Sequence, residues 1–149
     1  MYFLALPSAS GVYYSSLPQG RTLVSARSAS RALQHDDGRL CVYDSASNAT
    51  VWCSLGTPMS RGDYYTRMQG DGNLCTFTGT PPATSSAEDA VGSKQIWCAG
   101  SAPKPIANSH PQFYAAVQDS PNGGLCVYSG SAPSVGEDER VWCSNGARL

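Results

Sequence analysis

Apolar and polar residues alternate in short runs along most of the chain, and turn residues separate these runs. Residues 64–69 form one such run, Asp71-Gly72 marks a turn, and residues 74–77 form the next run. Two alternating runs joined by Asp-Gly are a strong signal for a β-hairpin. No segment shows the 3.6-residue period of an amphipathic helix. The pattern therefore predicts an all-β protein.

The segment before the first complete hairpin is less regular. Residues 1–10 indicate an extended arm, residues 11–16 have the composition of a strand, and residues 17–20 indicate a turn. Residues 21–26 alternate polar with apolar side chains again, which is typical of a half-buried strand that leads into the first hairpin.

A unit of strand, tight turn, strand, loop and Trp-bearing strand occurs three times. Each copy has Leu-Cys-Val-Tyr or a close variant, followed downstream by Val-Trp-Cys-Ser or a close variant. The tryptophans, evenly spaced, are Trp52, Trp97 and Trp142. Units that cannot bury an apolar face alone stack against one another. We expect three similar sheets around a common axis, with the tryptophans as wedges in the shared core.

The 149 residues are expected to form one domain, residues 1–149. Its internal repeats cover about residues 12–55, 56–100 and 101–146. Successive side chains of a strand point to opposite faces of its sheet. If the tryptophans face the core, the neighbouring cysteines therefore lie on the outer faces.

Six cysteines occur, two in each repeat, which indicates disulfides, an oxidising compartment and secretion. Repetition favours one bond of the same kind in each copy: Cys41–Cys53, Cys75–Cys98 and Cys126–Cys143. A metal site is not expected, because Cys-x-x-Cys is absent from the sequence. The two histidines, His35 and His110, show no relation to the repeated pattern.

Charged residues make up 14% of the chain, and the formal net charge is −1. This balance gives no electrostatic reason to expect nucleic acid or an anionic membrane as a partner. No apolar run approaches the ~20 residues that a membrane-spanning helix needs. Residues 1–6 are too short for a signal-peptide core, so we expect a mature or trimmed chain. The surface must owe its polarity to uncharged residues, as in glycan-binding and extracellular structural proteins.

Residues 69–77, Gln-Gly-Asp-Gly-Asn-Leu-Cys-Thr-Phe, resemble the Gln-x-Asp-x-Asn-x-Val-x-Tyr motif of the bulb-type, monocot mannose-binding lectins. The Trp-bearing strand of each repeat and the leading residues 17–40 are also similar to that family, and the resemblance covers about residues 12–146. It implies a β-prism II fold of three antiparallel four-stranded sheets with pseudo-threefold symmetry. In that family the Gln, Asp, Asn and Tyr side chains hydrogen-bond mannose, and the Val adds an apolar contact.

Carried over by position, the motif is incomplete in every repeat. The second repeat supplies Gln69, Asp71 and Asn73, with Cys75 in place of Val and Phe77 in place of Tyr. The weaker candidates are Gln34, Asp37 and Tyr43 in the first repeat, with Arg39 in place of Asn, and Gln118, Asn122 and Tyr128 in the third, with Gly124 in place of Asn. This alignment gives the first repeat one extra turn residue and the third repeat two. Polar side chains at a hairpin also cap turns, so both interpretations stay open.

The resemblance implies a secreted carbohydrate-binding module that makes weak, multivalent, mannose-type contacts. The alternative is an extracellular structural or protein-interaction subunit on a lectin scaffold whose sugar sites have decayed. Neither catalysis nor a cofactor is expected: no nucleophile motif occurs, and residues 137–139 form an acidic run in a loop. Family members often exchange a terminal strand between subunits, so residues 144–149 are a candidate for homo-oligomer formation. Asn48, in Asn-Ala-Thr, is a candidate for N-glycosylation.

Overall fold

The computed structural model describes residues 4–5, 16–25, 27–69, 72–80, 93–101, 113–119, 124–129 and 139–144. These residues form short β-strands and no helix, as the alternation predicts. The strands are β1 Leu4–Ala5, β2 Ser16–Pro18, β3 Thr22–Val24, β4 Ser30–Gln34, β5 Leu40–Asp44, β6 Thr50–Cys53, β7 Tyr64–Met68, β8 Leu74–Thr78, β9 Gln95–Cys98, β10 Phe113–Val117, β11 Leu125–Ser129 and β12 Glu139–Cys143.

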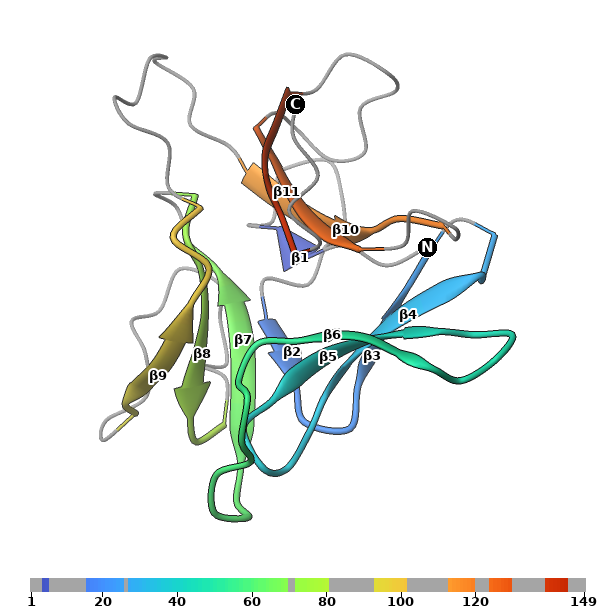
Figure 1. Ribbon diagram of the computed structural model, residues 1–149. Coiled ribbons are helices and arrows are strands. Elements are labelled where there is room, and N and C mark those ends of the chain that lie inside the picture. The colour runs from blue at the N-terminus through green and yellow to red at the C-terminus, as the bar shows by residue number, and fades with distance from the viewer. Residues whose placement is uncertain are drawn as a thin grey trace.

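The strands form three antiparallel four-stranded sheets that surround a common axis (Figure 1). The first sheet has the order β3-β4-β5-β6, the second β2-β7-β8-β9, and the third β1-β10-β11-β12. Each repeat thus supplies three consecutive strands, and the N-terminal segment supplies the fourth strand of every sheet. The three sheets are those expected from the repeat, and their arrangement is the β-prism that the resemblance implies.

The N-terminal segment differs in detail from the prediction. Leu17 and Pro18 belong to β2, where Leu17 pairs with Thr66 and is 4% exposed, so the turn begins after them rather than at residue 17. Pairing with a strand far away in the sequence overrides the local turn signal of Leu-Pro-Gln-Gly. The part of the arm at β1 lies beside β10, and residues 11–15 are outside the described residues.

The inner faces of the sheets share one hydrophobic core. Its larger members are Leu17, Leu23, Leu40, Val42, Met68, Leu74, Phe113, Val117, Leu125 and Val127. The rings of Trp52, Trp97 and Trp142 meet edge-to-face, with centroids 5.6, 5.9 and 6.2 Å apart. The tryptophans therefore converge as predicted, but each is only partly buried. All three lie on the last strand of a sheet, at its edge.

A buried polar chain links the first sheet to the second. Thr66 Oγ1 donates to Gln34 Oε1 at 2.5 Å and lies 2.7 Å from Thr76 Oγ1. Gln34 Nε2 donates to the carbonyls of His35 and Arg39, each at 3.3 Å. The side chains of Gln34, Thr66 and Thr76 are all fully buried. Buried polar groups are costly unless they are paired, and here each of these side chains has a hydrogen-bond partner.

The β4–β5 turn is fixed against the second sheet. Gly38 is buried with a φ of 87°, and a Cβ at this position would lie 2.9 Å from Ile96 Cδ1. The carbonyl oxygens of Asp36 and Asp37 accept hydrogen bonds from the amides of Gly62 and Met59, at 2.9 and 2.8 Å. The positive φ favours glycine, and a side chain here would also push aside the end of Ile96. These hydrogen bonds therefore join the β4–β5 turn to residues 59–62, which precede β7.

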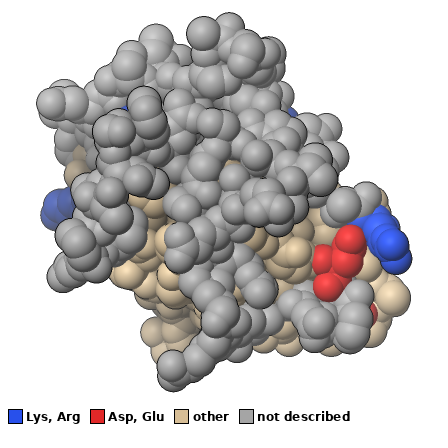
Figure 2. Space-filling model, turned by 90° about the horizontal axis from the view of Figure 1, so that it is seen from above, with Lys and Arg blue, Asp and Glu red and all other residues tan. Residues whose placement is uncertain are grey.

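Charged side chains are sparse on the described surface. In Figure 2 most of the described atoms are uncharged, and an acidic group lies beside a basic one at one edge of the molecule. Across the described residues, no helix is long and apolar enough to cross a membrane. The same residues contain no group of three His, Cys, Asp or Glu side chains that could hold a metal ion.

Candidate functional site

The outer face of each sheet is built on a disulfide. The bonds join Cys41 to Cys53, Cys75 to Cys98, and Cys126 to Cys143, which are the pairs that repetition predicts. Each joins residues directly opposite one another on the last two strands of a sheet. The closed loops span 12, 23 and 17 residues. Loops of this length correspond to about 3 kcal/mol of stabilisation each in the chain-entropy model.

The first outer face shows that the predicted alignment of the first repeat was wrong. Gln34 points into the core, so it cannot be the counterpart of Gln69. Steps of two residues back from Cys41 give Arg39, Asp37 and His35, with the same spacing as Cys75, Asn73, Asp71 and Gln69. The turn has no extra residue, and His35 occupies the position of the Gln. Sequence analysis missed His35, although this count would have found it.

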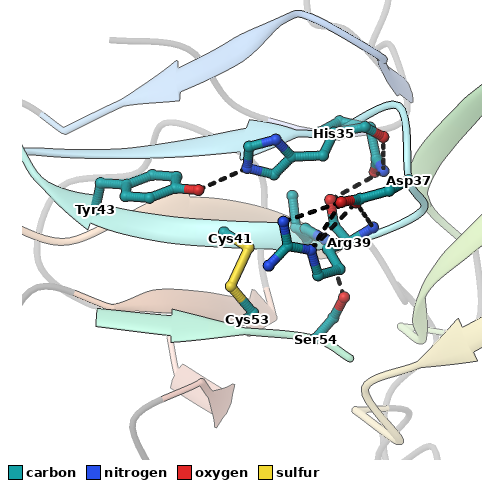
Figure 3. Close-up of a disulfide and its surroundings, with 9 residues drawn as sticks. His35, Asp37, Arg39, Cys41, Tyr43, Cys53 and Ser54 are labelled. Atoms are coloured by element: carbon teal, nitrogen blue, oxygen red, sulfur yellow. Dashed lines mark hydrogen bonds and ion pairs between the residues drawn. A yellow bond between two sulfur atoms is a disulfide. The ribbon is translucent and has the colours of Figure 1, made fainter. Parts of the chain in front are cut away.

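On the first face, two side chains orient Tyr43, and Figure 3 shows one of them, His35. Its hydroxyl lies 2.6 Å from His35 Nε2, and the two rings meet edge-to-face with centroids 5.9 Å apart. Arg31, opposite Tyr43 on β4, lies with its Cζ 5.0 Å from the centre of the tyrosine ring. Cation–π attraction and the hydrogen bond thus orient a ring that stays partly exposed.

Asp37 and Arg39 form an ion pair at the turn of the same hairpin (Figure 3). Arg39 Nη2 lies 2.9 Å from Asp37 Oδ2, and Arg39 Nε donates to both carboxylate oxygens at 3.2 and 3.1 Å. Burial opposes ionisation of Asp37, but hydrogen bonds from Arg39 and the positive charges of Arg39 and His35 outweigh it and lower the pKa of the carboxyl. The hydrogen bond to Asp37 raises the pKa of Arg39. The first face therefore presents fixed charges.

On the second face, aromatic rings fill the space above the disulfide. Tyr65 and Phe77 stack with centroids 5.4 Å apart, and they are 0% and 4% exposed. Asn73 Oδ1 accepts hydrogen bonds from the amides of Gly100 and Ser101 at 3.0 and 3.2 Å. Gln69 Oε1 lies 3.7 Å from Cys75 Sγ. Asp71 lies outside the described residues. Asn73 thus acts as a cap for the residues that follow β9.

On the third face, a glutamine replaces the histidine of the first. Gln118 Nε2 donates to the hydroxyl of Tyr128, which stacks on Tyr114 with centroids 5.1 Å apart. Gly124 is buried and supplies no side chain at the Asn position. Asn122 lies outside the described residues. Two of the three faces therefore keep a polar side chain bonded to a tyrosine hydroxyl.

Asp119, next to Gln118, ties the third sheet to the first. It accepts hydrogen bonds from Ser25 Oγ and from the amide of Arg27, the latter at 3.1 and 3.2 Å. The bond from Ser25, followed by the bonds from the backbone, lowers the pKa of Asp119. Its carboxylate serves the contact between sheets, so we do not assign it to a binding role.

A serine hydroxyl supports the start of the central strand in every sheet. Ser54, Ser101 and Ser144 accept hydrogen bonds from the amides of Leu40, Leu74 and Leu125 at 3.0, 3.1 and 2.9 Å. In the second repeat Ala99 stands where the others have serine, and Ser101 supplies the hydroxyl two residues later. Because Ser101 lies off the repeat pattern, its role has no signal in the sequence.

Asn48 is exposed in the loop before β6, with a φ of 60°. Its Oδ1 accepts a hydrogen bond from Arg31 Nη2, and its side-chain nitrogen is the atom that a glycan would modify. Glycosylation of Asn48 stays a prediction. The residues after Ser144, which were expected to exchange between subunits, lie outside the described residues, and His110 does too.

No protein-family model matches the sequence, and a search of curated proteins finds no match. Among solved structures, the chain is similar to a lectin from Marasmius oreades, with a TM-score of 0.60 at 16% identity, over 97% of this chain and 91% of that one. It is also similar to a monomeric monocot mannose-binding lectin from Gastrodia elata, with a TM-score of 0.54 at 20% identity, over 87% of this chain and 96% of that one. The chain has a bulb-type lectin-like fold.

On this lectin-like fold, the three outer faces are equivalent in backbone but different in chemistry. The first carries fixed charges around Tyr43, the second buried aromatic rings, and the third a neutral pair of Gln118 and Tyr128. The motif in the sequence predicts the second face as the main sugar site, whereas the polar groups that surround a partly exposed tyrosine lie on the first and third faces.

Proposed function

We propose that the protein is a secreted carbohydrate-binding module that makes weak contacts with glycans through its outer faces. The observation that carries this proposal is the hydrogen bond between a polar side chain and a tyrosine hydroxyl on the first and third faces. Polar groups of fixed geometry beside an aromatic ring suit a polyhydroxylated ligand. The similarity in fold to a mannose-binding lectin supports mannose-type residues as a starting point for tests.

Binding by any single face is expected to be weak, because each face lacks part of the family motif. The second face lacks a tyrosine hydroxyl at Phe77, and its Asn73 already accepts two backbone hydrogen bonds. The third face has Gly124 in place of Asn. Several weak sites on one molecule gain avidity when they engage one branched or clustered glycan together. Three disulfides fit a secreted protein that works outside the cell.

The second face keeps Gln69, Asp71 and Asn73 as a sugar-binding candidate. In this proposal it is the weakest of the three. Tyr65 and Phe77 are buried, so a sugar could reach only the rim formed by Gln69 and its neighbours. The proposal therefore places the stronger contacts on the first and third faces.

The test is a titration of the oxidised, isotope-labelled protein with methyl α-mannoside, followed by NMR of the backbone amides. We expect shifts that saturate in the millimolar range and that group around residues 35–43 and 118–128. Tyr43→Phe and Tyr128→Phe form a matched pair of variants, since each removes one hydroxyl and should weaken binding at its own face only. Shifts confined to residues 69–77 would overturn the ranking of the faces. No shift with mannose or with any glycan of a broad array would overturn the proposed function.

A second candidate function is a structural or protein-interaction subunit that keeps the scaffold without sugar binding. The filled second face favours it, because the stack of Tyr65 on Phe77 closes the surface that would receive a sugar. This candidate gains support if the glycan titrations show no binding. Neither candidate involves catalysis, a metal ion or a cofactor.

A further inference from the structure

The first face is basic at positions where the other two faces are neutral. The strand register makes these positions equivalent in the three sheets. The first sheet has Arg31, His35 and Arg39; the second has Tyr65, Gln69 and Asn73, and the third has Tyr114, Gln118 and Gly124. Basic side chains at these positions should make the first face attract anionic ligands more strongly than the other two faces do.

Asp37 offsets the charge of only one guanidinium on this face. It pairs with Arg39, whereas Arg31 contacts two neutral groups, the ring of Tyr43 and Oδ1 of Asn48. The face therefore carries a net positive charge, although the whole chain has a formal net charge of −1.

The geometry leaves donors on Arg39 for a ligand. Arg39 holds Asp37 through Nε and Nη2, and its side chain is 32% exposed. Among the described residues, Nη1 of Arg39 makes no hydrogen bond. The side chain lies near the Cys41–Cys53 disulfide, on the same face as His35 and Tyr43 (Figure 3). A guanidinium that is oriented by one carboxylate is well placed to donate to a second anionic group.

We propose that the first outer face binds an anionic sugar, one that carries a carboxylate or a sulfate on its exocyclic carbon. Arg39 donates to the anionic group, and Arg31 adds to the attraction over a longer range. The sugar hydroxyls contact Tyr43 and Asp37. This proposal rests on the proposed function and narrows the ligand class of one face, while the third face stays a site for neutral sugars.

The experiment compares three ligands that share one ring: methyl α-mannoside, methyl α-mannuronate and mannose 6-sulfate. Amide shifts of residues 35–43 report on the first face, and those of residues 113–119 and 124–128 report on the third. At low salt, at least one of the two acidic ligands should bind the first face about fivefold more tightly than the neutral one, as expected for a charge-assisted contact. Raising the salt to about 500 mM should reduce the preference. The third face should show no such preference.

Two variants distinguish a direct contact made by Arg39 from the longer-range attraction of Arg31. Arg31→Gln leaves the Asp37–Arg39 pair in place but removes the contact with the ring of Tyr43. It should therefore reduce the ratio of acidic to neutral affinity, even where binding of both ligands becomes weaker. Arg39→Gln should abolish the preference, and its amide spectrum away from the hairpin shows whether the fold is retained. A preference for the carboxylate or for the sulfate identifies which anionic group is recognised, and either supports the proposal.

The outcomes distinguish this inference from the function on which it rests. Equal affinity of the first face for neutral and acidic ligands overturns the inference and leaves glycan binding intact. A preference that is equally strong on the third face, or that survives in both variants, also overturns it. If none of the three ligands shifts the amide signals of any face, the proposed function itself is wrong.

Discussion

Gln34 and His35 are neighbours in the chain, yet their side chains lie on opposite faces of the first sheet. Gln34 is fully buried, and its Oε1 accepts a hydrogen bond from Thr66 Oγ1 at 2.5 Å. His35 lies on the outer face, where its Nε2 is 2.6 Å from the hydroxyl of Tyr43. Side chains alternate along a strand, so a shift of one residue exchanges a core position for a surface position. The two residues should therefore respond differently to substitution.

Gln34→Ala is expected to lower the free energy of unfolding by about 1–3 kcal/mol, because Thr66 loses a buried hydrogen-bond partner. His35→Ala should cost no more than about 1.5 kcal/mol, the value of one partly exposed hydrogen bond, and should weaken glycan binding at the first face. Urea denaturation of both variants measures the first effect, and the glycan titration measures the second. Equal losses of stability in the two variants would contradict the assignment of faces.

The strand order could be predicted only in part from the sequence. Alternation and Asp-Gly turns identify the hairpins, and equal spacing within matching strands brings Trp52, Trp97 and Trp142 together. The sequence could not show that the N-terminal segment supplies one strand to each sheet. The pairing of these N-terminal strands depends on contacts between residues far apart in the chain, such as Leu17 with Thr66. Local patterns carry no signal for such contacts.

The candidate site was harder to predict than the fold. Choosing Gln34 for its residue type, rather than His35 for its position, placed the motif on the wrong face of β4. The role of Asn73 was equally hidden, because its Oδ1 accepts from the amides of Gly100 and Ser101 across 27 and 28 residues of sequence. A residue type that can bind sugar can also cap a turn. Only the fold decides which role it takes.

Trp97→Ala is expected to lower the free energy of unfolding by about 3 kcal/mol, the lower end of the range for removing a large aromatic ring. The lower end is appropriate because the ring is partly buried, although it contacts Trp52 and Trp142. Denaturant unfolding of the oxidised protein measures the change. Val51→Ala is the control, since Val51 is 44% exposed and should change stability little. A loss for Trp97→Ala no larger than that of the control would contradict a shared tryptophan core.

The Asp37–Arg39 pair should make stability depend on pH in the acid range. Because the pKa of Asp37 is lower in the folded protein than in the unfolded chain, the pair contributes its full stabilisation above the ordinary carboxyl pKa of about 3.9. The contribution is lost as the pH falls through the lowered value. Asp37→Asn should remove it, so the two proteins should differ most near neutral pH and converge at low pH.

Thermal unfolding between about pH 5 and pH 2 measures this convergence for Asp37→Asn. Asp36→Asn is the matched control on the same turn. Its carboxylate lies 3.9 Å from Arg61, whose side chain is 88% exposed, so this ion pair should contribute little. A difference between wild type and Asp37→Asn that stays constant down to pH 2 would show that the carboxylate charge does not stabilise the turn.

Phe77→Tyr is expected to restore on the second face the hydrogen bond that the third face already contains. Tyr128 stacks on Tyr114 as Phe77 stacks on Tyr65, with centroids 5.1 and 5.4 Å apart, so the added hydroxyl should lie within reach of Gln69. The bond should raise the free energy of unfolding by up to about 1.5 kcal/mol, provided that the hydroxyl finds its partner. In glycan titrations the variant should also bind more tightly at residues 69–77, with no change at residues 35–43. The reverse change, Tyr128→Phe, should lower stability by a similar amount. If Phe77→Tyr destabilises the protein while Tyr128→Phe is neutral, the two faces are not equivalent, and the second has been repacked beyond recovery of a sugar site.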